Sequence, residues 1–221
     1  MIELHNIDCM EYLATLEDNA FELAIVDPPY GIGADENAYK NGIKCKVNGF
    51  KKHKKGGWDN SVPTYSYFRE LFRVSENQII WGGNYFDLPN VMSWIVWDKM
   101  QYNFSFAHGE LAWNSFNNKL KIFRYARGNE SGFAPKSTDI DKQFSNIHPT
   151  QKPVKLYEWL LMNYAKEGDR ILDTHLGSGS IAIACHNLGF DLVGCELDTD
   201  YFEAAQKRLQ QHQSQLRIPL T

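Results

Sequence analysis

Short apolar runs alternate with longer amphipathic stretches through most of the chain. The apolar runs predict strands at 2–5, 21–26, 77–83, 93–98, 170–174 and 191–196, with two weaker strands, antiparallel in arrangement, at 109–116 and 119–125. Apolar residues at helical spacing predict helices at 9–16, 64–75, 153–168 and 199–211, and one directly after the glycines at 177–179. Strands that alternate with helices indicate an α/β fold: a mostly parallel, twisted sheet with helices on both faces and ligand sites at the carboxyl ends of the strands.

The ends of these helices carry the expected signals. Asp8 stands at the N-cap of the first helix, and Asp198 or Thr199 can cap the last one. Pro153 fits the first turn of a helix whose apolar face consists of Tyr157, Leu160, Leu161 and Tyr164. The helix at 64–75 has a similar face, made of Tyr67, Phe68, Leu71 and Phe72.

Length and composition predict a single soluble domain over residues 1–221. Hydrophobic residues make up 43% of the chain, enough to bury a real core. No apolar run approaches the roughly 18 residues of a membrane span, and the first residues do not resemble a secretory signal. The cysteines show neither Cys-x-x-Cys nor a metal-ligand spacing with histidine: Cys9, Cys45, Cys185 and Cys195. We therefore expect reduced thiols, a cytoplasmic location and no metal.

One segment is strongly basic although the net charge of the whole chain is −4. Between Asn37 and Trp58 there is no acidic residue, and the lysines are Lys40, Lys44, Lys46, Lys51, Lys52, Lys54 and Lys55. Such a segment is ordinarily a solvated surface loop. It gains significance only beside a site that handles phosphates.

A nucleoside site is predicted near the end of the chain. The glycine turn Gly177-x-Gly179-x-x-Ala182 lets the backbone approach a nucleotide closely. Glu196, after the next strand, can accept hydrogen bonds from two ribose hydroxyls. The pattern is compatible with NAD, but the chain after Glu196 has room for one helix and not for a second nucleotide-binding half.

The third strand on this side of the sheet must come from elsewhere. The strand at 2–5 can supply it, in which case the last helix connects in space to the first strand and the motif order is circularly permuted. Asp8 would then face a bound adenine and accept from its exocyclic amine.

The strand at 21–26 runs directly into Asp27-Pro28-Pro29-Tyr30. A chain that only has to turn can use Asn-Gly or Asp-Gly, whereas two prolines remove most of the conformational freedom of the turn. Such stiffness indicates that the Asp27 carboxylate and its neighbours are held in place for a purpose.

These motifs together resemble the beta group of S-adenosylmethionine-dependent DNA amino-methyltransferases, the N6-adenine and N4-cytosine DNA methylases. The resemblance is carried by Asp-Pro-Pro-Tyr at a strand end, by "HPTQKP" at 148–153 and by the glycine loop with its acid, in that order. The stretch "ENQIIWGGNYF" at 76–86 is similar to phage and bacterial adenine methylases. The resemblance implies a Rossmann-like class I methyltransferase fold, S-adenosylmethionine as cofactor and double-stranded DNA as substrate, in a bacterial or phage-encoded enzyme of the restriction–modification type.

The resemblance assigns catalysis to Asp27, Pro28, Pro29 and Tyr30. The amine of adenine is a poor nucleophile, and two acceptors on its hydrogens, the Asp27 carboxylate and the Pro28 carbonyl, favour the pyramidal nitrogen that can attack a methyl group. Asp27 is too weak a base to deprotonate the neutral amine and takes the proton afterwards. Tyr30 is expected to stack on a base flipped out of the duplex.

Cofactor binding is assigned by the same resemblance to a larger set. Its members are Asp8, Cys9, Asp27, Thr150, Lys152, Asp173, His175, Leu176, Gly177, Ser178, Gly179, Ser180, Glu196 and Leu197. Thr150 and Lys152 are expected to serve the carboxylate of the methionine end. His175 departs from the aromatic residue usual in this family, and we expect it to replace that residue in packing.

DNA binding is expected at two places. The basic segment within 31–60 is expected to close over DNA phosphates, and a small insertion at 99–147 is expected to read the target sequence. The predicted contacts are Lys40, Lys44, Lys46, Lys51, Lys52, Lys54, Lys55, Arg124 and Arg127, with Asn103, Asn114 and Lys136 as further candidates. So short an insertion predicts relaxed specificity or help from a second subunit in a homodimer.

Several alternatives stay open. N4-cytosine methylation requires the same geometry of the amine, although N4-cytosine methylases more often begin the catalytic motif with serine. RNA guanine and protein glutamine methylases normally place the glycine loop before the catalytic turn. An NAD-dependent oxidoreductase of Rossmann type has no use for Asp-Pro-Pro-Tyr, and a non-catalytic DNA-binding relic would not need it intact.

Overall fold

The computed structural model describes residues 1–33, 59–100, 107–126 and 151–214. Within these ranges the elements follow in the order β1 (Ile2–Asn6), α1 (Cys9–Leu13), β2 (Phe21–Val26), α3 (Tyr65–Val74), β3 (Ser75–Trp81), η1 (Gly83–Tyr85), β4 (Trp94–Asp98), β5 (Gly109–Asn114), β6 (Lys121–Arg124), α5 (Val154–Tyr164), β7 (Arg170–Asp173), α6 (Ser180–Leu188), β8 (Asp191–Glu196) and α7 (Thr199–Gln213). The strands and helices predicted within these ranges are confirmed, with small shifts at their ends.

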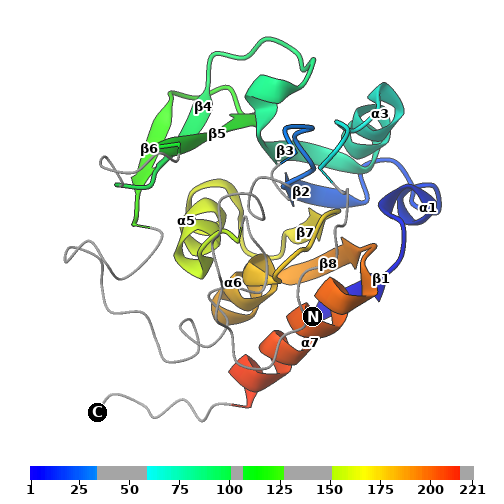
Figure 1. Cartoon of the computed structure of the whole chain (residues 1–221). Helices are drawn as coiled ribbons and strands as arrows, with labels where there is room; N and C mark the ends of the chain where they lie inside the picture. The colour runs from blue at the N-terminus through cyan, green and yellow to red at the C-terminus, as the bar shows by residue number, and fades with distance from the viewer. Residues whose placement is uncertain (34–58, 101–106, 127–150, 215–221) are drawn as a thin grey trace.

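The described strands form one mixed sheet in the order β1-β8-β7-β2-β3-β5-β4-β6 (Figure 1). The first five of these strands are parallel, as predicted. β5 runs antiparallel to both β3 and β4, and β6 is parallel to β4. The predicted antiparallel arrangement of the two weaker strands is therefore right for β5 and wrong for β6. The more apolar β4 separates them, which buries its Ile95 and Trp97.

The start of the chain supplies the strand beside β8, which confirms the circularly permuted order (Figure 1). β1 pairs with β8 in parallel, with Ile2 opposite Leu192 and His5 opposite Cys195. Asn6 extends the contact, because its Nδ2 donates to the carbonyl of Glu196 at 2.8 Å. Ile7 and Asp8, which follow β1, therefore lie beside the end of β8.

Helices cover both faces of the sheet, as predicted (Figure 1). Along β2, Leu23 and Ile25 belong to a core with buried residues of α5, α6 and α7. Ala24 and Val26 belong to a second core with buried residues of α1 and α3. Since successive side chains of a strand point to opposite faces, this alternation builds two cores on one sheet.

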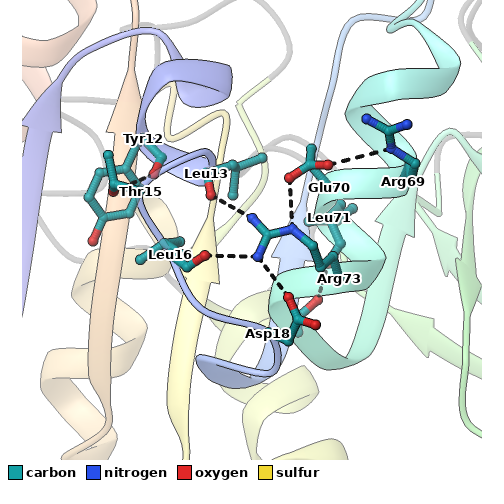
Figure 2. A network of polar contacts seen from close by, with 10 residues as sticks. Tyr12, Leu13, Thr15, Leu16, Asp18, Arg69, Glu70, Leu71 and Arg73 are labelled. Atoms are coloured by element: carbon teal, nitrogen blue, oxygen red, sulfur yellow. Dashed lines mark hydrogen bonds and ion pairs between the residues drawn. The ribbon is translucent and has the colours of Figure 1, made fainter.

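Arg73 joins the last turn of α3 to the chain that follows α1 (Figure 2). Its guanidinium donates to the carbonyls of Leu13 and Leu16 at 2.9 and 2.8 Å, to Asp18 at 2.9 Å and to Glu70 at 2.8 Å. Carbonyls at a helix end lack partners within the helix, and Arg73 satisfies them. This contact fixes the two helices on that face, and α1 ends at Leu13, earlier than predicted.

Three further observations concern only the described residues. Their helices are too short or too polar to cross a membrane. Their cysteines, Cys9, Cys185 and Cys195, are free thiols. They contain no cluster of three or more histidine, cysteine or acidic side chains suited to a metal ion.

Candidate active site

Four parallel strands bring their acidic residues to one edge of the sheet. β2 and β7 are neighbours, with Leu23 opposite Ile171 and Ala24 opposite Leu172. Asp27 therefore leaves β2 beside the place where the glycine loop leaves β7. Glu196 ends β8, and Asp8 follows β1 at the same edge. The carboxyl ends of parallel strands are the usual position of ligand sites in such sheets.

A pocket of about 760 Å³ lies at this edge. Of the predicted site residues, those that line it are Asp8, Cys9, Asp27, Pro28, Pro29, Tyr30, Lys152, His175, Leu176, Gly177, Ser178, Glu196 and Leu197. Asp173, Gly179 and Ser180 are described but do not line it, and Thr150 lies outside the described residues. The volume is in the range of pockets that hold cofactors and small ligands.

Glu196 holds the glycine loop through the backbone. Its Oε2 accepts from the Gly177 amide at 2.8 Å and its Oε1 accepts from the Asp198 amide at 2.9 Å. Each carboxylate oxygen has a second lone pair, so Glu196 can also accept from two vicinal hydroxyls. Burial raises the pKa of Glu196, and the two amide contacts oppose that rise.

The loop is packed from behind by α7. Gly179 has φ +70°, and a Cβ there would lie 3.0 Å from the Cβ of Ala205. The Arg208 guanidinium donates to the carbonyl of Ser178 and to the Ser180 hydroxyl, both at 2.9 Å. Gly179 and Ser180 therefore support the shape of the loop, which explains why they do not face the pocket.

His175 is held in place by its neighbours. Its Nδ1 is 2.9 Å from the Thr174 hydroxyl, which is itself 2.7 Å from the Tyr67 hydroxyl, and its ring meets the Tyr67 ring edge to face at 5.3 Å. Its amide donates to Asp173 at 3.0 Å. Burial lowers the pKa of His175 to about 4 and raises the pKa of Asp173 to about 8. The imidazole is therefore neutral at neutral pH, in keeping with a packing role.

A buried carboxylate from outside the predicted set holds the Asp-Pro-Pro-Tyr turn. Asp59 is 1% exposed, and its Oδ1 accepts from the amides of Tyr30 and Gly31 at 2.7 and 2.9 Å. Asp59 follows the basic segment, and nothing in the local pattern "GGWDNS" distinguishes it from a surface acid. Sequence reasoning missed it because the contact joins residues far apart in the chain.

Both oxygens of Asp27 have partners. The Tyr30 hydroxyl donates to Oδ1 at 2.6 Å, and the Lys152 ammonium forms an ion pair with Oδ2. Burial raises the pKa of Asp27, and Lys152 opposes that rise. The Asp27 carboxylate is therefore oriented before any substrate arrives, which is the condition for electrostatic preorganisation.

The Tyr30 ring is half-buried and packed against its neighbours. It stacks on Tyr85 at 5.1 Å between centroids, and a Cβ on Gly82 would clash with it. The stacking of Tyr30 on a target base stays a prediction. The contact of Tyr30 at the site is made by its hydroxyl, which donates to Asp27.

Most predicted DNA contacts lie outside the described residues, namely Lys40, Lys44, Lys46, Lys51, Lys52, Lys54, Lys55, Arg127, Asn103 and Lys136. Arg124 is described on β6, where it is exposed and lies 3.3 Å from Asp98. Asn114 was wrongly proposed as a reader of DNA, because it is fully buried and donates to the carbonyl of Ser93 at 3.1 Å.

Comparison with known proteins agrees with this geometry. A family model described as DNA methylase, for N6 and N4 methyltransferases, matches residues 80–207. The Type II methyltransferase M.HpaI of Haemophilus parainfluenzae is 25% identical over 91% of this chain and 72% of its own length. The Type II methyltransferase M2.DpnII of Streptococcus pneumoniae is 24% identical over 95% of this chain and 90% of its own length.

Solved structures share the fold. The complex of M1.HpyAVI with S-adenosylmethionine superimposes with a TM-score of 0.57 at 20% identity, covering 95% of this chain and 100% of that one. PvuII DNA methyltransferase, which is cytosine-N4-specific, gives a TM-score of 0.58 at 12% identity, covering 94% of this chain and 86% of that one. The family model matches more than half of the chain. The chain therefore belongs to the N6/N4 DNA methylase family, as its motifs predicted, and is a DNA methyltransferase with S-adenosylmethionine as its methyl donor.

Proposed function

We propose that this enzyme methylates the exocyclic N6 amine of adenine, at specific sites in double-stranded DNA, in the cytoplasm of a bacterial cell. The observation that carries the proposal is the Asp27-Pro28-Pro29-Tyr30 turn, held rigid by Asp59 at the edge of a nucleoside-sized pocket. The beginning of the motif with Asp, instead of the serine more common in cytosine enzymes, favours adenine.

The residues at the pocket fit S-adenosylmethionine, which supplies an electrophilic methyl group when bound. Glu196 has lone pairs available for the ribose hydroxyls, and the Gly177 loop brings backbone close to them. Asp8, whose Oδ1 caps α1 through the Met10 amide at 2.8 Å, lines the pocket where it can accept from an adenine amine. Leu176, buried in the loop, offers an apolar surface.

Asp27 and Pro28 act on the target amine. An amine nitrogen conjugated with the ring must become pyramidal to attack, and acceptors on its two hydrogens favour that geometry. The Asp27 carboxylate and the Pro28 carbonyl provide these acceptors. After methyl transfer the nitrogen is cationic, and Asp27 accepts its proton. Burial, which raises the pKa of Asp27, makes it a better acceptor at this stage.

A pocket at the edge of the sheet can receive only a base that has left the duplex. The lysines of the basic segment within 31–60 would neutralise DNA phosphates and hold the duplex over the turn. The part of 99–147 outside β5, which belongs to the main sheet, would read the sequence, and its small size favours a second subunit at the DNA. Sedimentation of the free enzyme and of its DNA complex tests for the homodimer.

Transfer of tritium from labelled S-adenosylmethionine to a plasmid, followed by separation of the nucleosides, tests the proposal. We expect the label in N6-methyldeoxyadenosine. Label confined to N4-methyldeoxycytidine would make the enzyme a cytosine methylase and contradict the proposed base. The family match already excludes the NAD-dependent oxidoreductase.

A further inference from the structure

Asp27 belongs to a group of four charges, mostly shielded from solvent, which we call the charge cluster: Asp27, Lys152, Glu110 and Lys99. The Lys152 ammonium contacts Asp27 and lies 3.1 Å from Oε2 of Glu110. Oε1 of Glu110 lies 2.5 Å from the Lys99 ammonium. The two lysines are buried, with Lys152 3% and Lys99 6% exposed, whereas the side chains of Asp27 and Glu110 are 18% and 20% exposed. Two cations and two anions balance, which buried charges require.

The antiparallel strand β5 explains how Glu110 reaches Asp27. β5 begins where β3 ends, with Trp81 opposite Ala112 and the Gly82 amide donating to the Leu111 carbonyl at 2.8 Å. Glu110 near the start of β5 therefore lies at the same edge of the sheet as the end of β2. Lys99 follows β4 at that edge, and its amide donates to the His108 carbonyl at 2.9 Å.

The contacts of Lys152 account for its whole donor capacity. An ammonium has three N–H donors. Within the described part of the chain, they face Asp27, Glu110 and the Tyr30 hydroxyl, the last at 3.3 Å. The indole ring of Trp81 lies 5.1 Å from the same nitrogen. This arrangement favours Lys152 as a partner of Asp27 over the predicted role toward the cofactor carboxylate.

Glu110 is the anion that both lysines share. Burial opposes its ionisation, but Lys152 and Lys99 outweigh burial and lower the pKa of Glu110 to about 2. Glu110 is therefore ionised throughout the working pH range. It gives Lys152 a fixed second partner, so that the ammonium cannot rotate freely about its contact with Asp27.

We propose that Glu110 is a positioning residue for methyl transfer: it holds the Lys152 ammonium against one oxygen of Asp27, while the Tyr30 hydroxyl holds the other. The lone pairs of Asp27 that remain are thereby directed toward the target amine. This role rests on the proposed function, because it requires Asp27 to accept from that amine. Lys99 neutralises the far oxygen of Glu110.

Glu110→Gln removes the charge of Glu110 while keeping its size. We expect kcat to fall about 10²-fold, as for a misplaced catalytic group, while the Kd for S-adenosylmethionine stays within about three-fold. Glu158→Gln is the matched control, because Glu158 is also a glutamate paired with a lysine, Lys155, at 2.7 Å, and its side chain does not line the pocket. It should leave kcat unchanged.

The double variant Lys99→Met with Glu110→Gln separates positioning from folding. It leaves one cation and one anion in the charge cluster, so it should recover the thermal stability that the single variant loses. We expect kcat to stay low in the double variant, because Lys152 still lacks an ionised second partner. Recovery of kcat would show that Glu110 serves only as a counter-ion for Lys99 and would overturn the proposal.

The pH profile of kcat provides a readout that a purely structural role would not move. The charged and titratable groups that act on Asp27 are Lys152, Glu110, Tyr30, Asp173 and Tyr157. Glu110 raises the pKa of Asp27, so its loss should move the acid limb of the profile to lower pH. An unmoved acid limb would contradict direct coupling of the two groups.

The possible failures are distinguishable. If the wild-type enzyme methylates DNA and Glu110→Gln has an unchanged kcat, the role of Glu110 is overturned and the proposed function stands. If Glu110→Gln raises only the Kd for the cofactor, Lys152 serves the cofactor and the proposal is overturned. If the wild-type enzyme transfers no methyl group to DNA, both proposals fail.

Discussion

The two halves of the pocket are built by different means. On the cofactor side, Glu196 holds the glycine loop through the Gly177 and Asp198 amides, and Arg208 of α7 packs behind the loop. On the target side, the Asp27 turn is fixed by side chains from distant segments, Asp59 and Lys152. The carboxylate that holds the first half belongs to the glycine-loop motif itself, whereas Asp59 and Lys152 lie outside the Asp-Pro-Pro-Tyr motif and reach it only in the complete fold. The two sides should therefore respond differently to substitution.

Asp27→Ala should abolish the function of the target side and leave cofactor binding intact. Loss of the acceptor for the amine and for its proton should lower kcat about 10³-fold, the scale of a lost general base. Calorimetry should still show S-adenosylmethionine binding, because Glu196 and the glycine loop are untouched. Asp27→Asn, which keeps the shape of the side chain, is the control for a collapsed turn. Loss of cofactor binding in both variants would contradict the separation of the two sides.

Glu196→Gln should weaken cofactor binding and leave methyl transfer at saturating cofactor nearly unchanged. The amide group of Gln offers one acceptor oxygen, so it cannot accept from both the Gly177 and Asp198 amides and also from ribose. The Kd for S-adenosylmethionine should rise on the order of 10-fold to 100-fold, as expected for lost charged hydrogen bonds. At saturating cofactor, kcat should change far less. Glu3→Gln on the outer strand is the matched control, and equal effects of the two variants would refute this role.

The positions of Gly177, Glu196 and Asp8 at the pocket could be predicted from the sequence. The glycines, Glu196 and Asp8 stand at fixed offsets from strands that periodicity reveals, and β1 had to fill a vacant position beside β8. The catalytic turn could be located because two prolines after an acid are uncommon at a strand end. These features are local, so the pattern of the chain contains them.

The supports of the target side could not be predicted in this way. Glu110 lies in an ordinary strand, and Lys99 follows another, with nothing in their spacing that links them to Asp27. Their importance comes from the antiparallel direction of β5, which the pattern of the chain did not distinguish from β6. Asn114 failed as a candidate for a related reason, since its burial depends on the position of β5 inside the sheet.

Asp59→Ala removes a support of the Asp27 turn but keeps the groups that are proposed to act on the target amine. Two amides of the turn lose their acceptor, and misplacement of Asp27 should lower kcat about 10-fold. Asp59→Asn keeps the Oδ1 acceptor and should retain most of the activity. Steady-state kinetics with saturating cofactor measures both variants. A larger loss for Asn than for Ala would show that the charge of Asp59, and not its hydrogen bonds, matters.

His175→Phe should have the smallest effect. Because His175 is neutral at pH 7 and packs on Tyr67, the aromatic replacement should leave kcat nearly unchanged. Its pKa is lowered in the folded state to about 4, so the unfolded chain takes up the proton first as pH falls, and the wild type loses stability between about pH 6.5 and pH 4. Thermal melts should show that the Tm of the variant, relative to the Tm of the wild type, is higher at pH 5 than at pH 7. The same difference in Tm between variant and wild type at both pH values would contradict the burial of a neutral imidazole.

The most direct test of the whole site is a crystal structure of the enzyme bound to S-adenosylmethionine. We expect the ribose hydroxyls on Glu196, the adenine amine at Asp8 and the sulfonium methyl group turned toward Asp27 and the Pro28 carbonyl, with Lys152 still paired to Asp27 and Glu110. A methyl group directed away from Asp27, or a cofactor carboxylate that draws Lys152 off Asp27, would contradict this account.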